Sequence, residues 1–267
     1  MLQKIRFSKR SYFLRQIYRI ASEFGFNPIA LILSITGIPL YIYQTIQFRL
    51  KNTFSESNFS VSSLSPCLKD RYQGDSHIDK HYFYQDLWAA RKVYQNNPAN
   101  HIDVGSRIDG FIAHLLTFRK VEVLDIRTID SQIDGMTFRQ ADLMQFDSLP
   151  IAEYDSVSCL HALEHFGLGR YGDSIDPDGH IKGLKSLIML LKSNGKLLLS
   201  VPIGRERIEF NAHRVFAVST IVDLTSSNLD MISFSYINDN GEFYEDMSIQ
   251  EIPTMNYGCG LFEFTKK

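Results

Sequence analysis

Hydrophobic and polar positions switch repeatedly between helical periodicity and short apolar runs in the last two thirds of the chain. The segment 81–95 places Phe83, Leu87, Ala90 and Val93 at helical spacing, which predicts a helix with one buried face. The predicted strands are 100–104, 121–126, 137–140, 154–160, 196–201, 231–237 and 259–265, and the other predicted helices are 108–118, 181–191 and 217–224. Five strands that alternate with helices, followed by a terminal pair, predict an α/β fold with a mostly parallel seven-stranded sheet.

Two boundaries of these elements carry signals of their own. Asn194 and Gly195 form a C-cap pair that predicts the end of the helix 181–191. Pro202 predicts the end of the strand 196–201. Ligands of mostly parallel sheets bind at the carboxyl ends of the strands. We therefore expect the functional residues directly after the first four strands.

An uncharged segment near the N-terminus runs from Phe24 to Phe48. Its length is sufficient to span a bilayer. Pro28, Gly37 and Pro39 are residues that interrupt helices, so we expect two or three short helices in place of a simple transmembrane span.

The N-terminal arm is basic, whereas the rest of the chain is acidic. Residues 1–51 contain eight basic side chains and one acidic side chain, a net charge of +7; since the whole chain carries −2, the remainder carries −9. A basic arm suggests an anionic partner, and two interpretations of residues 1–50 stay open for a cytoplasmic protein. The slightly favoured one is that the arm packs on the following domain, and the second is that it contacts the inner face of a membrane. The net charge gives no reason to expect nucleic-acid binding.

Composition divides the chain into three parts. Residues 51–69 are rich in Ser and Asn and predict a linker between a helical arm, 1–50, and a domain, 70–267. The cysteines are far apart and lack zinc-site spacing, so we expect free, buried thiols in a reducing cytosol. They are Cys67, Cys159 and Cys259.

The first predicted strand leads into a glycine turn with the sequence HIDVGSRIDG (101–110). Gly105 permits a tight turn beneath a ligand at the start of a helix. Gly105 and Gly110 match the outer glycines of a dinucleotide fingerprint, with Arg107 at its middle position. Asp125 lies 20 residues after Gly105, where an acid can hold ribose hydroxyls in a dinucleotide site or in a methyl-donor site.

Three further features favour the methyl donor. Asp103 lies two residues before Gly105, where an acid can meet a cationic amino group. Asp142 follows the third strand and can accept from an adenine amino group. The run CLHALEHFG (159–167) follows the fourth strand. In order and spacing these features resemble the motifs of class I S-adenosylmethionine-dependent methyltransferases. The resemblance implies a Rossmann-like fold and S-adenosylmethionine as cofactor, with Asp103, Gly105, Arg107, Gly110, Asp125 and Asp142 at its site.

The chain also resembles, over nearly its whole length, the uncharacterised family named domain of unknown function 268. The matching stretches are HYFYQDLWAA, HIDVGSRIDGF, VEVLDIR, LHALEHFGLGRYGDSIDPDGH and FNAHRVF. This resemblance implies a methyltransferase-like protein associated with surface polysaccharides.

The turn departs from the methyltransferase pattern at two positions. Arg107 and Asp109 stand where the pattern has its second and third glycines. Arg107 therefore either clamps an anionic group of the ligand or fills the donor site by folding onto Asp103 or Asp109. We favour the clamp.

Polar residues after the fourth and fifth strands are candidates for chemistry and for acceptor binding. Transfer to a hydroxyl needs a base, and a histidine has a suitable pKa. The predicted catalytic residues are His161, Glu164, His165 and His213, and the predicted substrate-binding residues are Arg170, Tyr171, Asp173, His180, Arg205, Asn211 and Arg214. The acids of 173–178 lack the spacing of an EF-hand, so no metal site is predicted.

These features support two functions of different kinds. The first is a methyltransferase that acts on a sugar or surface-glycan precursor. The alternative is an inactive methyltransferase-fold module that binds a nucleotide or glycan intermediate and scaffolds a membrane-surface assembly. A nicotinamide oxidoreductase is a third and weaker candidate function, because the middle glycine of the dinucleotide fingerprint is missing.

Overall fold

The computed structural model describes residues 17–18, 20–52, 63–68, 78–130, 132–145 and 151–267. The chain forms two units, Met1–Ile78 and Asp79–Lys267. The predicted boundary between linker and domain at residue 70 lies outside the described residues, as does most of the predicted linker.

After a short helical stretch that ends at residue 23, the uncharged segment forms one continuous helix, α2 (Pro28–Asn52), so the prediction that Pro28, Gly37 and Pro39 divide this segment into short helices was wrong. Pro28 opens the helix, where a backbone N–H is not needed, and the side chain of Asn27 caps it by accepting from the N–H of Ala30 at 2.9 Å. Pro39 lies inside the helix and removes only one backbone hydrogen bond from a long ladder. Within the described residues, Ala30–Lys51 is long and apolar enough to cross a membrane by length and composition.

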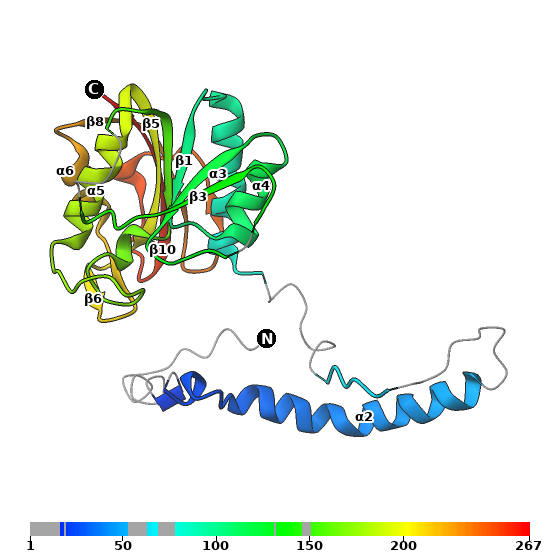
Figure 1. Ribbon diagram of the computed structural model, residues 1–267. Coiled ribbons are helices and arrows are strands. Elements are labelled where there is room, and N and C mark those ends of the chain that lie inside the picture. The colour runs from blue at the N-terminus through cyan, green and yellow to red at the C-terminus, as the bar shows by residue number, and fades with distance from the viewer. Residues whose placement is uncertain (1–16, 19, 53–62, 69–77, 131, 146–150) are drawn as a thin grey trace. The chain divides into compact units, whose positions relative to one another are not determined.

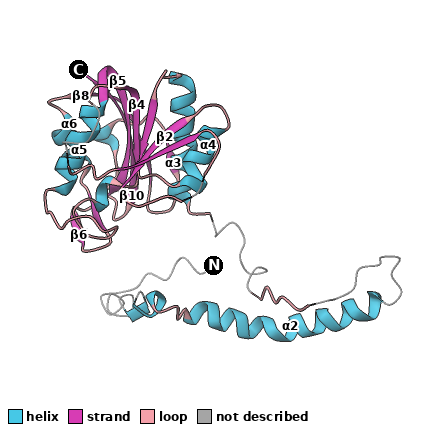
Figure 2. Cartoon of the chain, in the orientation of Figure 1, coloured by secondary structure: helices cyan, strands magenta, loops and turns pink. Residues whose placement is uncertain are grey.

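The second unit is built on an eight-stranded sheet with the order β3-β2-β1-β4-β5-β10-β8-β9. The first five strands of the chain are parallel, and β10 runs antiparallel between β5 and β8. The strands of the sheet are β1 (His101–Val104), β2 (Val121–Asp125), β3 (Met136–Gln140), β4 (Tyr154–Leu160), β5 (Leu191–Ile203), β8 (Leu229–Ile237), β9 (Phe243–Tyr244) and β10 (Gly258–Lys266). All seven predicted strands are present, and the α/β class is confirmed (Figure 2).

Helices cover both faces of this sheet. Figure 1 shows α3 and α4 on one side and α5 and α6 on the other. The helical elements of this unit are α3 (Lys80–Asn96), η3 (Ile108–Ile112), α4 (Ala113–Leu116), η5 (Leu163–His165), α5 (Gly179–Leu190), α6 (Val218–Thr225) and η6 (Ile249–Glu251). A small hairpin of β6 (Arg207–Glu209) and β7 (His213–Val215), which the sequence pattern did not predict, lies outside the main sheet.

Two predicted boundaries were wrong. Helix α5 ends at Leu190, before the predicted cap pair; Asn194 takes a left-handed conformation, φ +62°, in the irregular first part of β5. Strand β5 continues past Pro202 to Ile203. The pairing of β5 with β4 ends at Ser200, but Pro202 remains opposite Cys259 in the pairing with β10, and this pairing continues the strand although Pro202 has no N–H to donate.

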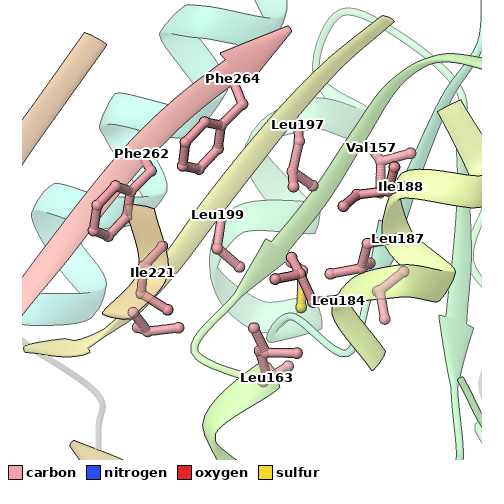
Figure 3. Packing of buried hydrophobic residues seen from close by; sticks show 14 of the residues in the cluster. Val157, Leu163, Leu184, Leu187, Ile188, Leu197, Leu199, Ile221, Phe262 and Phe264 are labelled. Atoms are coloured by element: carbon pink, nitrogen blue, oxygen red, sulfur yellow. The ribbon is translucent and has the colours of Figure 1, made fainter. Parts of the chain in front are cut away.

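Successive side chains of the central strands point alternately into two hydrophobic cores, one on each face of the sheet. Leu197 and Leu199 of β5 pack with Phe262 and Phe264 of β10 beneath α5 and α6 (Figure 3). Leu198 belongs to the opposite core, which includes residues of α3 and α4. Each fully buried leucine stabilises the fold by about 1.5–3 kcal/mol. These cores hold the carboxyl ends of the parallel strands in fixed positions.

Candidate functional site

Two cavities adjoin at the carboxyl ends of the parallel strands. The strand-end cavity is lined by Val104, Gly105, Leu124, Asp125, Ile126, Ala141, Asp142, Leu143, Met144, His165, Phe166, Tyr171 and Asp173. The histidine cavity is lined by Asp79, His81, Tyr82, His161, Glu164, His165, Arg170, Tyr171, His213, Asp239 and Tyr257. His165 and Tyr171 line both, so the two cavities share a wall.

Asp125 ends β2 and faces the strand-end cavity, as the sequence predicted for a ribose-binding acid. Its Oδ1 accepts from the backbone N–H and the Nε of Arg127 at 2.8 and 3.0 Å, and its Oδ2 accepts from Nη2 at 2.7 Å. The guanidinium of Arg127 also lies 4.6 Å from the centre of the Tyr171 ring. Sequence reasoning missed Arg127, because a basic residue two positions after a strand-end acid is too common to be diagnostic.

The turn after β1 requires the glycine that the sequence indicated. Gly105 has φ +72°, and a Cβ there would lie 2.9 Å from the Cβ of Ala162. Asp103, in contrast, is fully buried and lines neither cavity. Its carboxylate accepts from the backbone N–H and hydroxyl of Ser106 at 3.0 and 2.7 Å and from the hydroxyl of Ser158 at 2.6 Å. Burial raises the pKa of Asp103 to about 6, although these hydrogen bonds oppose the shift.

Arg107 and Gly110 lie outside the lining of both cavities. The Arg107 guanidinium binds Asp109 through Nε and Nη2 at 3.0 and 2.8 Å and lies 4.9 Å from the centre of the Tyr82 ring. The side chain of Arg107 is 51% exposed and folds onto Asp109 outside the lining of the strand-end cavity. Gly110 leaves room for Asp86 of α3, whose carboxylate a Cβ at residue 110 would overlap.

The strand-end cavity is mainly apolar and narrow. One of the polar groups that line the cavity is the carboxylate of Asp142, which follows β3. Its Oδ1 accepts a hydrogen bond from the backbone N–H of Met144 at 2.9 Å. The volume open to a water-sized sphere is about 40 Å³, compared with about 350 Å³ in the histidine cavity.

All four predicted catalytic residues line the histidine cavity. His161 Nδ1 lies 2.8 Å from Glu164 Oε1, and both side chains are almost fully buried. Burial lowers the pKa of His161, but Cys259 and Glu164 outweigh burial and hold it well above its ordinary value. Burial likewise opposes ionisation of Glu164, yet His161 keeps the pKa of Glu164 below its ordinary value. Both pKa shifts favour the ionised form of the pair, an imidazolium beside a carboxylate.

The backbone at His161 is strained and anchored. His161 has φ +50°, which is uncommon for a residue other than glycine and clusters at functional sites. Its N–H donates to the hydroxyl of Ser200 at 3.0 Å, and that hydroxyl bonds Gln85 of α3. Glu164 Oε2 is buried without a hydrogen-bond partner among the described residues, whereas His161 also interacts with Cys259.

Aromatic rings form much of the remaining wall. The rings of His81 and His161 stack with centroids 6.0 Å apart, and His81 also stacks on Tyr257 at 5.6 Å. Burial and the neighbouring His161 lower the pKa of His81 to about 4, so His81 is neutral at physiological pH. Tyr82 and Tyr257 were missed from the sequence: Tyr82 looked like one more position in a helical pattern, and Tyr257 lies far along the chain.

The predicted substrate residues separate into three groups. Arg170 and Tyr171 line the histidine cavity, whereas Asp173 holds the loop by accepting from the backbone N–H groups of Gly167 and Gly169 at 2.8 and 3.0 Å. Arg214 is buried and donates to the carbonyls of residues 164, 166 and 177 at 3.4, 2.6 and 3.2 Å, so it supports the same loop. His180, Arg205 and Asn211 line neither cavity.

Cysteine and metal chemistry have little support within the described residues. Cys159 and Cys259 are buried and free, as predicted, whereas Cys67 is exposed, which corrects the expectation of three buried thiols. No group of three or more His, Cys, Asp or Glu side chains in the described part of the chain is arranged to hold a metal ion.

Comparison with known proteins identifies a family and a fold. The family described as Caenorhabditis protein of unknown function, DUF268, matches residues 113–247. No curated protein matches the chain. Among solved structures, the N-methyltransferase NodS from Bradyrhizobium japonicum, in complex with S-adenosylhomocysteine, is 12% identical with a TM-score of 0.50, and the match covers 72% of this chain and 90% of NodS.

A second solved structure gives the same result. The 1,6-didemethyltoxoflavin-N1-methyltransferase from Burkholderia thailandensis, with its substrate and S-adenosylhomocysteine bound, is 14% identical with a TM-score of 0.51. The match covers 78% of this chain and 93% of that enzyme. At these identities the likeness concerns the fold, and it confirms the predicted class I methyltransferase architecture.

Proposed function

Since the chain belongs to the family described as Caenorhabditis protein of unknown function, DUF268, and has a class I methyltransferase fold, we propose that it is an S-adenosylmethionine-dependent methyltransferase acting on a sugar or surface-glycan precursor. The observation that carries this proposal is the shared wall between the two cavities. A narrow cavity containing Asp125 meets a wider polar cavity at His165 and Tyr171. Methyl transfer needs this arrangement, because donor and acceptor must meet while each is held separately.

The polar and apolar side chains that line the strand-end cavity are suited to binding S-adenosylmethionine. The Asp125 carboxylate at the end of β2 provides acceptors for ribose hydroxyls. Asp142 provides an acceptor for the adenine amino group, and the apolar side chains of Ile126, Leu143 and Met144 suit the faces of the base. Asp103 is too deeply buried to meet the donor without a change of the turn.

The histidine cavity fits a hydroxylated ring better than an anion. Tyr82, Tyr171 and Tyr257 line it, and aromatic faces pack well against the apolar side of a sugar ring. Burial raises the pKa of Tyr257 to about 12, so its hydroxyl remains a donor at physiological pH. The guanidinium of Arg214, predicted to bind substrate, instead donates to backbone carbonyls.

Isothermal calorimetry with purified full-length protein tests the donor. S-adenosylhomocysteine should bind with one site per chain, and nicotinamide dinucleotides should give no heat of binding. The absence of binding at millimolar S-adenosylhomocysteine would contradict the proposal at its first step. Turnover is then tested with S-adenosylmethionine and a panel of methyl glycosides, following the release of S-adenosylhomocysteine.

The second candidate is a non-catalytic module that binds a glycan intermediate at the inner face of a membrane. Two observations favour it: Arg107 and Asp109 replace turn glycines, and the strand-end cavity is narrow. In this case the histidine cavity binds its ligand while S-adenosylhomocysteine does not bind. The same calorimetric titration therefore separates the two candidates.

A further inference from the structure

His165 occupies a position that the other histidines of the site do not share. It lines both the strand-end cavity and the histidine cavity, whereas His81, His161 and His213 line only the histidine cavity. A group that removes a proton from a methyl acceptor must reach the acceptor oxygen beside the donor. His165 is the histidine at that junction.

The structure also fixes the tautomer of His165. Its Nδ1 lies 2.6 Å from the carbonyl oxygen of Ala212. A carbonyl oxygen only accepts hydrogen bonds, so Nδ1 must carry the proton and donate. In the neutral ring Nε2 then holds the lone pair. Nε2 makes no hydrogen bond within the described residues, and its nearest charged partner is Glu164 Oε1 at 3.7 Å. The lone pair of Nε2 is therefore available to accept a proton.

The surroundings of His165 keep its ring neutral at physiological pH. Burial lowers the pKa of His165, and the cations Arg170 and His161 lower it further, which outweighs the opposing effects of Glu164 and of the Ala212 carbonyl. Tyr171 and His213 also face the ring, with centroids at 5.3 and 6.5 Å. In His161, by contrast, Nδ1 is committed to Glu164 Oε1 at 2.8 Å and Nε2 is buried, so neither nitrogen is open to an acceptor.

We propose that Nε2 of His165 is the general base that accepts the proton of the acceptor hydroxyl where the two cavities meet. This inference rests on the proposed methyltransferase function. As the acceptor oxygen bonds to the methyl carbon, the carbon–sulfur bond of the donor breaks and its electron pair stays on sulfur, which becomes a neutral thioether. The hydroxyl proton passes to Nε2 of His165 and leaves to water after the product departs.

Nitrogen-15 NMR of the imidazole rings tests the base without any acceptor. In uniformly labelled full-length protein, the His165 signal is assigned by its loss in His165→Asn. The signal should show a neutral ring protonated at Nδ1 at pH 7.5, with a titration midpoint below 6.5. A charged ring at pH 7.5, or a proton on Nε2, would overturn the proposal.

Turnover provides the second readout. In His165→Asn the side-chain amide can still donate to the Ala212 carbonyl, but no basic nitrogen remains. With S-adenosylmethionine and the methyl glycoside panel, this variant should lose about 10²- to 10⁴-fold in rate. Rates are compared at saturating S-adenosylmethionine, because His165 also lines the proposed donor cavity. A rate comparable to the wild type overturns the base assignment.

A matched control uses a histidine away from the site. His114 of α4 is exposed and lines neither cavity, so His114→Asn should keep the wild-type rate and the His165 signal. The two levels of failure are distinguishable. If wild-type protein does not bind S-adenosylhomocysteine, the proposed function fails; if it binds but His165 carries its proton on Nε2, only the base assignment fails.

Discussion

The guanidinium of Arg127 donates two hydrogen bonds to the carboxylate of Asp125, from Nε at 3.0 Å and from Nη2 at 2.7 Å. A donor ribose that binds Asp125 must therefore share this carboxylate with Arg127. Asp125 has lone pairs for more than the three hydrogen bonds that it accepts from Arg127, so sharing is chemically reasonable.

Replacing Asp125 tests this sharing. Asp125→Ala removes the acceptor for the ribose hydroxyls, and binding of S-adenosylhomocysteine should weaken by about 1–3 kcal/mol through loss of charged hydrogen bonds. Calorimetry measures the change. Arg127→Ala is the matched control, since it breaks the same ion pair but keeps the carboxylate, and it should retain binding. Equal losses in both variants would show that the ion pair, and not the acceptor, matters.

Arg107→Gly restores the turn glycine of the methyltransferase pattern. Because Arg107 binds Asp109 and stacks near Tyr82 outside the strand-end cavity, we expect little change in S-adenosylhomocysteine affinity. The loss of an exposed ion pair should cost at most about 1 kcal/mol of unfolding free energy. Markedly weaker ligand binding would indicate a clamp in the bound state, and markedly tighter binding would support the scaffold function.

The buried carboxylate of Asp103 makes stability depend on pH. Its pKa rises from 3.8 to about 6 on folding, so the folded state binds its proton more tightly than the unfolded state does. This contribution to stability is full below pH 3.8 and is lost as pH rises through about 6. Relative to Asp103→Asn, the wild type should lose about 1.4 kcal/mol per pH unit within that window. Urea unfolding from pH 4 to 7 measures the difference, and parallel curves would contradict it.

The N-terminal unit should bind membranes without crossing them. The backbone carbonyl of Leu68 lies against Gly37 in the middle of α2, and a non-helical chain with free backbone groups is not tolerated beside a helix in the hydrocarbon core. Exposed side chains such as Ile35, Ile38 and Ile42 instead suit the interface. Carbonate or high-salt washing should release full-length protein from membranes. Release by detergent alone would establish a span.

The sequence by itself determined the α/β class, the strand positions and the strand ends where polar residues gather. Period-two and helical patterns report burial directly, because each side chain of a strand or helix faces one side. For this reason Asp125, Asp142 and the segment 161–165 were found at the correct edge of the sheet. The continuity of α2 was not predicted, because Gly37 and Pro39 were expected to break the helix. In the structure their local helix-breaking tendency is too weak to interrupt a long apolar helix.

Only the tertiary structure decided which of these polar residues face a ligand. Asp103 and Arg214 are residues of suitable type near suitable strand ends. Packing nevertheless directs Asp103 beneath the turn and Arg214 into a loop. His165 differs from His161 through contacts with Ala212 and Glu164, and the Ala212 contact joins segments far apart in the chain. Side-chain direction and protonation depend on such distant neighbours, and a linear pattern of residues does not encode which neighbours meet.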